Sequence, residues 1–91
     1  MINITPEAEQ TMYDDAIKAY PEECCGFMFG KEDSAGNRVV TAALPVVNAA
    51  SENRKRRFLI APIDYINGEQ YALDNGFDLL GIYHSHPDHP A

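Results

Sequence analysis

A short apolar segment near the C-terminus, residues 79–83, most constrains the fold of this chain, because two histidines and a proline follow it directly. A run of this length and composition is typical of a buried strand. In an extended chain, residues i and i+2 point the same way, so His84 and His86 could offer two imidazoles to one metal ion. The same spacing also occurs by chance in exposed loops, and spacing alone leaves both interpretations open.

The length and the cysteines bound the class of protein. The chain has 91 residues, so we expect one small domain over residues 1–91. It contains no apolar run long enough for a membrane span and no secretion signal at its start, which predicts a cytoplasmic protein without a membrane partner. A disulfide between the adjacent Cys24 and Cys25 would be strained and would close no useful loop, which favours a reducing compartment.

Acidic residues dominate the charge of the chain. Seven basic against fourteen acidic residues give a net charge of −7, which argues against a nucleic-acid partner, because phosphate binding needs a positive surface. One basic cluster, residues 54–57, departs from this balance. It is typical of a solvated loop that leads into a strand, and it could alternatively be a docking patch for an acidic protein partner.

Two helices are predicted. The first covers residues 6–20, because Thr5 is a suitable N-cap, Pro6 suits the first helical position and Pro21 ends the helix. The second begins at Pro62 and ends at Gly76, which is a natural C-terminal cap. The expected inner face of the first helix consists of Ala8, Met12, Ala16 and Ile17, and that of the second of Ile63, Ile66, Gln70 and Leu73.

The remaining segments predict strands. The turn signal at residues 33–37 indicates that the first two strands form an antiparallel hairpin, and Pro45 suggests an edge position or a bend. The order helix, strands, helix, strand predicts an α/β fold, of the α+β type with one mixed sheet and flanking helices. The expected strands are residues 24–29, 39–47, 57–60 and 77–83.

Carboxylates at the start of the first strand could meet the histidines at the end of the last one. Catalytic zinc takes three protein ligands and a water, and a nearby carboxylate receives the proton of that water. Glu22 and Glu23 precede the first strand and would reach His84 and His86 if the two strands are neighbours. Two solvated glutamates are the alternative. The cysteines are expected to be small buried groups. Two alternatives remain open: a nucleophilic cysteine served by His84, and a structural zinc site of one cysteine with both histidines. Adjacent cysteines, however, lack the usual spacing of zinc ligands.

Two separated motifs, Pro-Glu-Glu-Cys-Cys-Gly-Phe-Met-Phe-Gly at residues 21–30 and Gly-Ile-Tyr-His-Ser-His-Pro at residues 81–87, resemble the JAMM (MPN-plus) metallopeptidase family. The resemblance implies a cytidine-deaminase-like JAMM/MPN fold. It also implies that Glu23 is the general base, that His84 and His86 are zinc ligands, and that the reaction is hydrolysis of an amide or isopeptide bond. The implied substrates carry that bond at the C-terminus of a ubiquitin-like or sulfur-carrier protein.

The chain departs from the family pattern after the histidines. The family continues with a serine and then an aspartate, the third zinc ligand, and with further strands and a helix, none of which occurs before Ala91. Asp88 and His89 are the only substitutes for that ligand, and the prolines around them restrict the necessary turn. We therefore expect an incomplete domain that binds zinc poorly, cleaves little and self-associates through an uncovered sheet edge. A non-catalytic scaffold of the same fold is the alternative function.

Overall fold

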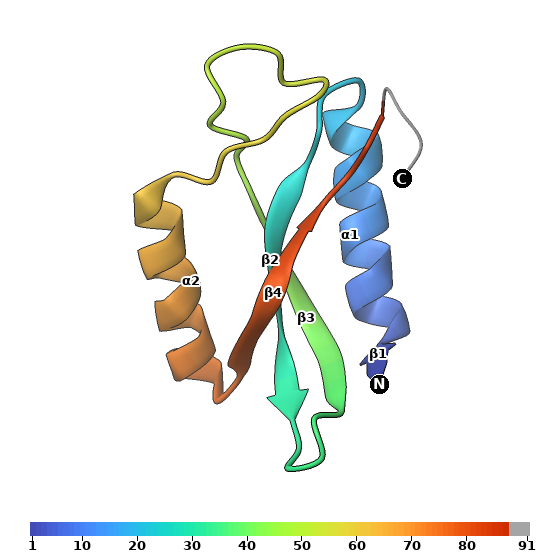
Figure 1. Ribbon diagram of the computed structural model, residues 1–91, viewed down its shortest axis with the longest axis vertical. Coiled ribbons are helices and arrows are strands. Elements are labelled where there is room, and N and C mark those ends of the chain that lie inside the picture. The colour runs from blue at the N-terminus through green and yellow to red at the C-terminus, as the bar shows by residue number, and fades with distance from the viewer. Residues whose placement is uncertain (88–91) are drawn as a thin grey trace.

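A computed structural model describes residues 1–87 of the chain, so Asp88 and His89 lie outside the described residues. Two helices and four strands follow one another along the chain (Figure 1). Their order and bounds are β1 (Ile2–Ile4), α1 (Pro6–Ala19), β2 (Cys25–Glu32), β3 (Arg38–Val46), α2 (Pro62–Asn75) and β4 (Asp78–His84).

The strands form one mixed sheet in the order β1-β3-β2-β4. β1 runs parallel to β3, whereas β2 is antiparallel to both β3 and β4. The two helices lie on opposite sides of this sheet (Figure 1). This architecture confirms the predicted α/β fold with a mixed sheet and flanking helices. Neither helix within residues 1–87 is long and apolar enough to cross a membrane.

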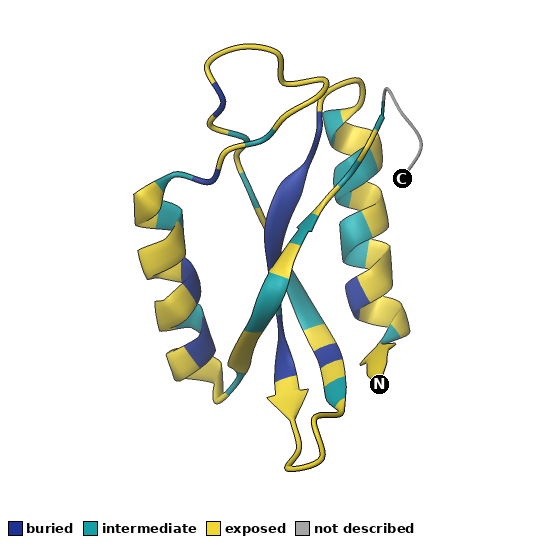
Figure 2. Ribbon diagram, in the orientation of Figure 1, coloured by how far each residue is buried: buried dark blue, intermediate teal, exposed yellow. Residues whose placement is uncertain are grey.

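The core lies between the sheet and α2, and β2 is its centre (Figure 2). Phe27 and Phe29 are fully buried there, together with Cys25. Gly68 lets α2 approach this layer, since a Cβ at that position would lie 3.0 Å from the Phe27 ring. A glycine inside a helix costs some stability, and here the close packing of α2 on the sheet requires it.

The predicted helix ends are confirmed. The Thr5 side chain accepts a hydrogen bond from the Ala8 N–H at 3.2 Å, so it caps α1 as expected. Gly76 caps α2 in the left-handed region, at φ 67°, where glycine is favoured over other residues. In α1, however, only Ala8 of the expected inner face is fully buried, and Ile17 is 60% exposed.

The predicted inner face of α2 is wrong. Ile63 is 59% exposed, Ile66 62% and Leu73 76%, whereas Gly68 and Ala72 are buried. The physical reason is the close approach of α2 to the phenylalanines on β2, which leaves no room for a side chain at Gly68. Beside this contact Tyr65 and Tyr71 pack against Phe27 and Phe29, whereas the aliphatic side chains that were expected inside are exposed.

Two strand predictions also need correction. β1 was not expected, and residues 57–60 do not form a strand. Instead, the Leu59 N–H donates to Oδ1 of Asn48 at 3.1 Å and the Leu59 carbonyl accepts from the Ala49 N–H at 2.8 Å, so this segment is extended but outside the sheet. The prediction for Pro45 is confirmed, because β1 pairs with β3 only as far as Val40 and leaves Pro45 on an open edge.

Candidate active site

The pairing of β2 with β4 brings Glu23 to His84. Cys25 and His84 are partners in the antiparallel register, so the residues just before β2 and just after β4 lie side by side. Oε1 of Glu23 lies 3.5 Å from Nδ1 of His84, and the Glu23 side chain is only 3% exposed. Glu22 is exposed instead. The predicted meeting of an acid with the first histidine is therefore observed, and it involves Glu23 rather than Glu22.

The two imidazoles lie together at the end of β4. The ring centroids of His84 and His86 are 4.6 Å apart, a separation at which both rings could reach one ion placed between them. The ring of Phe58 stacks on His84 with centroids 4.5 Å apart and an interplanar angle of 24°, which fixes the plane of that imidazole. His86 is exposed, so the pair faces solvent on one side.

The described residues do not complete a metal site by themselves. Within residues 1–87 no group of three or more histidine, cysteine, aspartate or glutamate side chains is arranged to hold a metal ion. A structural zinc site made of a cysteine with both histidines is therefore not formed there. His84 and His86 offer two nitrogen donors of the type that zinc prefers, whereas a catalytic zinc site takes three protein ligands.

Ser85 holds the ends of the two strands together. Its hydroxyl oxygen accepts a hydrogen bond from the Cys24 N–H at 2.9 Å, and its own N–H donates to the Cys24 carbonyl at 3.3 Å. These bonds join residues that are 61 positions apart in sequence. The sequence analysis did not select Ser85 and so missed its part in joining the two strand ends beside the site.

Both cysteines are free and buried, as expected of small apolar groups. Burial raises the pKa of the Cys25 thiol to about 11 and also raises the pKa of Cys24. Cys25 donates weakly to the Val46 carbonyl, at 3.8 Å. Because a nucleophilic cysteine needs a lowered pKa and access to substrate, neither thiol fits that role.

Asn48 is a site residue that the sequence analysis did not select. Its amide nitrogen donates to the carbonyl of Glu23 at 3.1 Å and to the carbonyl of Arg57 at 3.0 Å. Its side-chain oxygen accepts from the N–H groups of Ala50 and Leu59, each at 3.1 Å. The bond to Ala50, two residues on, is an Asx turn, which an asparagine at a strand end could have indicated. Asn48 thus ties the loop after β3 to the backbone of Glu23.

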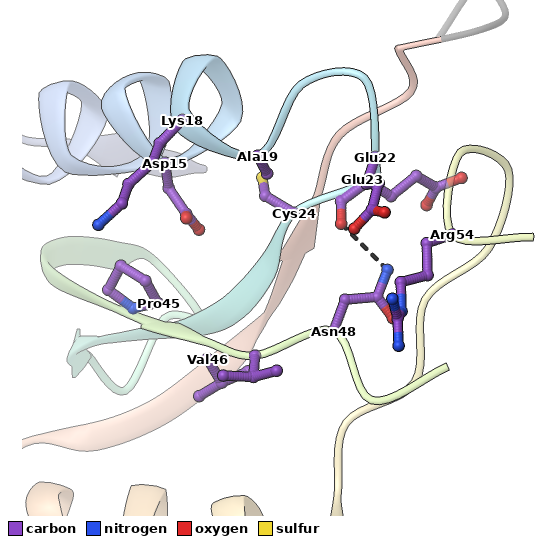
Figure 3. A pocket seen from close by; sticks show the side chains of 11 residues that line it. Asp15, Lys18, Ala19, Glu22, Glu23, Cys24, Pro45, Val46, Asn48 and Arg54 are labelled. Carbon is purple, nitrogen blue, oxygen red and sulfur yellow. Dashed lines mark hydrogen bonds between the residues drawn. The ribbon is translucent and has the colours of Figure 1, made fainter. Parts of the chain in front are cut away.

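A cleft of about 530 Å³ opens beside Glu23, between the end of α1, the end of β3 and the loop that follows β3 (Figure 3). Acidic and basic side chains both face it, and neither His84 nor His86 is part of its lining. Glu23 thus lines the cleft and also lies beside His84, which is outside the cleft lining. The cleft is lined by Asp15, Lys18, Ala19, Glu22, Glu23, Cys24, Pro45, Val46, Val47, Asn48 and Arg54.

A second contact fixes the strand that carries the histidines. The Tyr83 hydroxyl donates to Oδ2 of Asp15 at 2.8 Å and so connects β4 to α1. The tyrosine passes over Gly26 on β2, where a Cβ would lie 2.5 Å from Cε2 and Oη of the ring. Burial and the contact with the Asp15 carboxylate raise the pKa of the Tyr83 phenol above its ordinary value. The glycine of the Cys-Cys-Gly run thus has a steric function beside the site.

Comparison with known proteins places these features in a family. The family model described as prokaryotic homologs of the JAB domain matches residues 5–91. The desampylase of Haloferax volcanii is 38% identical over 68 residues, which are 75% of this chain and 46% of that protein. The chain therefore spans about half the length of the curated relative it matches.

Two solved structures share the fold. The solution structure of protein DSY2949 from Desulfitobacterium hafniense has a TM-score of 0.89 and 31% sequence identity, and the match covers 100% of this chain and 60% of that one. A solution structure of a protein from Salinibacter ruber has a TM-score of 0.64 and 40% identity, over 97% of this chain and 57% of that one. These matches confirm the JAMM (MPN-plus) resemblance of the motifs, and the chain belongs to the family of prokaryotic JAB-domain proteins.

Proposed function

We propose that this chain is part of a JAB-type hydrolase that cleaves amide or isopeptide bonds at the C-terminus of a ubiquitin-like or sulfur-carrier protein. The observation that carries the proposal is the buried carboxylate of Glu23, 3.5 Å from His84, at the end of two neighbouring strands. A relative named desampylase supports hydrolysis as the reaction class. The two free cysteines are compatible with the reducing cytoplasm, which we propose as the location.

In this proposal Glu23 is the general base. Its carboxylate accepts a proton from the attacking water and later donates that proton to the nitrogen of the leaving amine, as a single well-placed carboxyl group can do in both halves of a hydrolysis. The backbone of Glu23 is held in place, because its N–H donates to the Arg54 carbonyl at 2.7 Å and its carbonyl accepts from Asn48, and burial beside His84 restricts its carboxylate. A fixed base needs little reorganisation when the proton moves.

Zinc is the metal that the donor set fits best, and His84 and His86 would hold it. Neutral imidazole nitrogens are common zinc ligands, and the two rings lie near each other beside the base. When bound, zinc supplies a Lewis acid that makes water a nucleophile at neutral pH. We propose that residues 1–91 are one part of the catalytic domain, with a third ligand from a longer chain. A calorimetric titration of residues 1–91 alone should accordingly show weak zinc binding.

The test is hydrolysis by the full-length protein. The substrate is a ubiquitin-like protein joined through its C-terminus to a reporter amine. Glu23→Gln should lower kcat by at least about a hundredfold, the lower bound of general acid–base catalysis, while leaving KM little changed. Glu22→Gln is the matched control, because Glu22 is exposed and does not contact His84. Equal activity of the Glu23→Gln variant and the wild type would reject the assignment.

The alternative is a non-catalytic scaffold of the same fold. His84→Ala in the full-length protein distinguishes the two, because a hydrolase loses both zinc and cleavage. A scaffold shows no cleavage in either form and keeps its partner binding. The buried glutamate beside an imidazole favours the hydrolase, since burial of a carboxylate is costly and a scaffold does not need it.

A further inference from the structure

The loop between β3 and α2 carries an unusual concentration of positive charge. Four of the seven basic residues of this chain, residues 54–57, lie within it, although the net charge is −7. All four residues are exposed. The loop lies at the end of the molecule where β2 begins and β4 ends, opposite the β2–β3 hairpin (Figure 1).

This basic loop (residues 54–57) is anchored to the candidate base itself. The Arg54 carbonyl accepts a hydrogen bond from the Glu23 N–H at 2.7 Å, and the Arg57 carbonyl accepts from the Asn48 side chain at 3.0 Å. The Arg56 and Arg57 N–H groups both donate to the Asn53 carbonyl, which closes a tight turn. The backbone of the loop is therefore held at a fixed place relative to Glu23.

No ion pair among residues 1–87 neutralises the charges on this loop. Within residues 1–87, the ion pairs are Arg38 with Glu32 and His84 with Glu23, and neither involves the basic loop. Arg54 donates to the Ala50 carbonyl at 2.7 Å and lines the cleft beside Glu23, where Figure 3 shows its side chain near Asn48. Lys55, Arg56 and Arg57 remain directed to solvent. The chain has twice as many acidic as basic residues, yet none of the acidic residues within 1–87 forms an ion pair with this loop.

We propose that the basic loop is an electrostatic docking surface for an acidic face of the protein substrate, beside the bond to be cleaved. The inference rests on the proposed function and adds the charge of its substrate. Guanidinium groups bind carboxylates in a bidentate manner, and unpaired exposed charges attract an oppositely charged partner over about 8 Å at physiological ionic strength. A nucleic acid is the less suitable polyanion, because the net charge of −7 would repel its extended phosphate backbone.

The experiment measures cleavage and binding by the full-length protein at a series of salt concentrations. The probes are a ubiquitin-like protein with an acidic face, joined through its C-terminus to a reporter, and the same protein with that face neutralised. Arg56→Glu is compared with Lys31→Glu, which makes the same charge change on β2 near the hairpin at the opposite end of the sheet. Binding of the acidic probe is also measured with the Glu23→Gln variant, in which cleavage should not interfere. Binding of a duplex oligonucleotide to the wild type is measured in the same way.

For the acidic probe we expect Arg56→Glu to lower kcat/KM about tenfold at low salt, through KM with kcat unchanged, and to flatten the salt dependence. Lys31→Glu should not differ from the wild type with the acidic probe. With the neutralised probe, Arg56→Glu should not differ from the wild type. If the wild type binds in this pattern but never cleaves, the docking surface stands and the proposed reaction fails. If it cleaves and Arg56→Glu matches the wild type, the reaction stands and the docking surface is wrong. Absence of any binding, or tighter binding of the oligonucleotide than of the acidic probe, also overturns the inference.

Discussion

The hydroxyl of Tyr83 lies 2.8 Å from a carboxylate oxygen of Asp15, and this bond fastens the strand that carries the histidines to α1. Tyr83 directly precedes His84, so any shift of this tyrosine moves the imidazole beside Glu23. The bond is thus a mechanical link between a helix that contributes no candidate catalytic residue and the strand that does.

Removal of the Tyr83 hydroxyl should destabilise the fold. Tyr83→Phe leaves the partly buried carboxylate of Asp15 without this donor, and we expect a loss of about 1–2 kcal/mol in the free energy of unfolding. Asp15→Asn should cost a similar amount, and the double variant should cost less than the sum, because both changes remove one bond. Denaturant titrations measure these values. Tyr13→Phe, at a residue that is 62% exposed, is the control, and an equal loss there would contradict the argument.

The same bond has a consequence for pH dependence. Burial and the Asp15 carboxylate raise the pKa of Tyr83, so the phenol ionises in the unfolded chain at a lower pH than in the folded one. Its contribution is complete below the ordinary tyrosine pKa of about 10 and is lost as the pH rises above that value. The alkaline fall in stability should therefore be shallower in Tyr83→Phe than in the wild type. The range to measure is from about pH 9 to about pH 11, one unit on each side of the ordinary tyrosine pKa. If the stability of the wild type and that of Tyr83→Phe fall in parallel over this range, the prediction is wrong.

Gly26 should not tolerate a methyl group. A Cβ there would lie 2.5 Å from the Leu44 carbonyl oxygen and from the Tyr83 ring, and the carbonyl belongs to a paired strand that cannot move freely. We expect Gly26→Ala to lower the free energy of unfolding by about 2–3 kcal/mol, as overpacking does in other cores. Gly81→Ala is the matched control on β4, because its Cβ would meet only the flexible end of Met28, at 3.2 Å. Thermal unfolding of the two variants decides the matter, and equal effects would refute the steric explanation.

The two hydrogen bonds that the Asn48 amide donates should be required for the stability of the loop after β3. Asn48→Asp keeps an oxygen that can accept from Ala50 and Leu59 but replaces the amide that donates to the carbonyls of Glu23 and Arg57. We expect a loss of about 2 kcal/mol or more and faster proteolysis within the loop, since a carboxylate would face two carbonyl oxygens. Asn75→Asp is a control, because Asn75 makes one exposed bond to the Tyr71 carbonyl. Wild-type protease resistance in Asn48→Asp would show that the donors are dispensable.

The two thiols should be unreactive in the folded protein. Because burial raises the pKa of Cys25 to about 11 and also raises that of Cys24, the thiolate fraction at pH 8, about a quarter for free cysteine with its ordinary pKa of about 8.5, becomes much smaller. Iodoacetamide at pH 8 should therefore label neither residue until denaturant is added. Mass spectrometry counts the labelled sites, and rapid labelling of either cysteine without denaturant would contradict the buried assignment.

Residues 1–91 expressed alone should self-associate. Within residues 1–87, β4 pairs with β2 on one side only, and Leu73, Ile63 and Ile66 expose apolar surface on α2. We expect sedimentation to show oligomers whose proportion grows with concentration, and Leu73→Lys, at a side chain that is 76% exposed, to reduce them without loss of fold. A monomer at every concentration would refute this prediction.

Much of the architecture could be predicted from local signals. Thr5, Pro6 and Gly76 marked helix ends because capping depends on a few neighbouring residues, and the structure has these ends as predicted. The face of α2 could not be predicted in the same way. Large apolar residues at helical spacing indicated one side, but the width of the space above Phe27, a tertiary property, selected Gly68 and Ala72 instead.

In the candidate site, too, local sequence patterns indicated some residues, whereas others depend on contacts between distant segments. The spacing of His84 and His86 indicated a pair, and the register of β4 on β2 places Glu23 beside the first of them. Asn48 escaped notice because its importance lies in partners up to 25 positions away, which no local pattern reveals. Likewise, residues 57–60 have the composition of a strand, but their backbone groups bond to Asn48 and Ala49 rather than to a neighbouring strand.

The pair of hydrogen bonds between Ser85 and Cys24 has a consequence for biosynthesis. The two residues are 61 positions apart, and His84 on β4 and His86 just after it are synthesised long after Glu23. A nascent chain that has formed β2 and β3 therefore exposes a lone acid without its imidazoles. The pairing of Glu23 with His84 is therefore absent from every half-made molecule and forms only when β4 docks on β2.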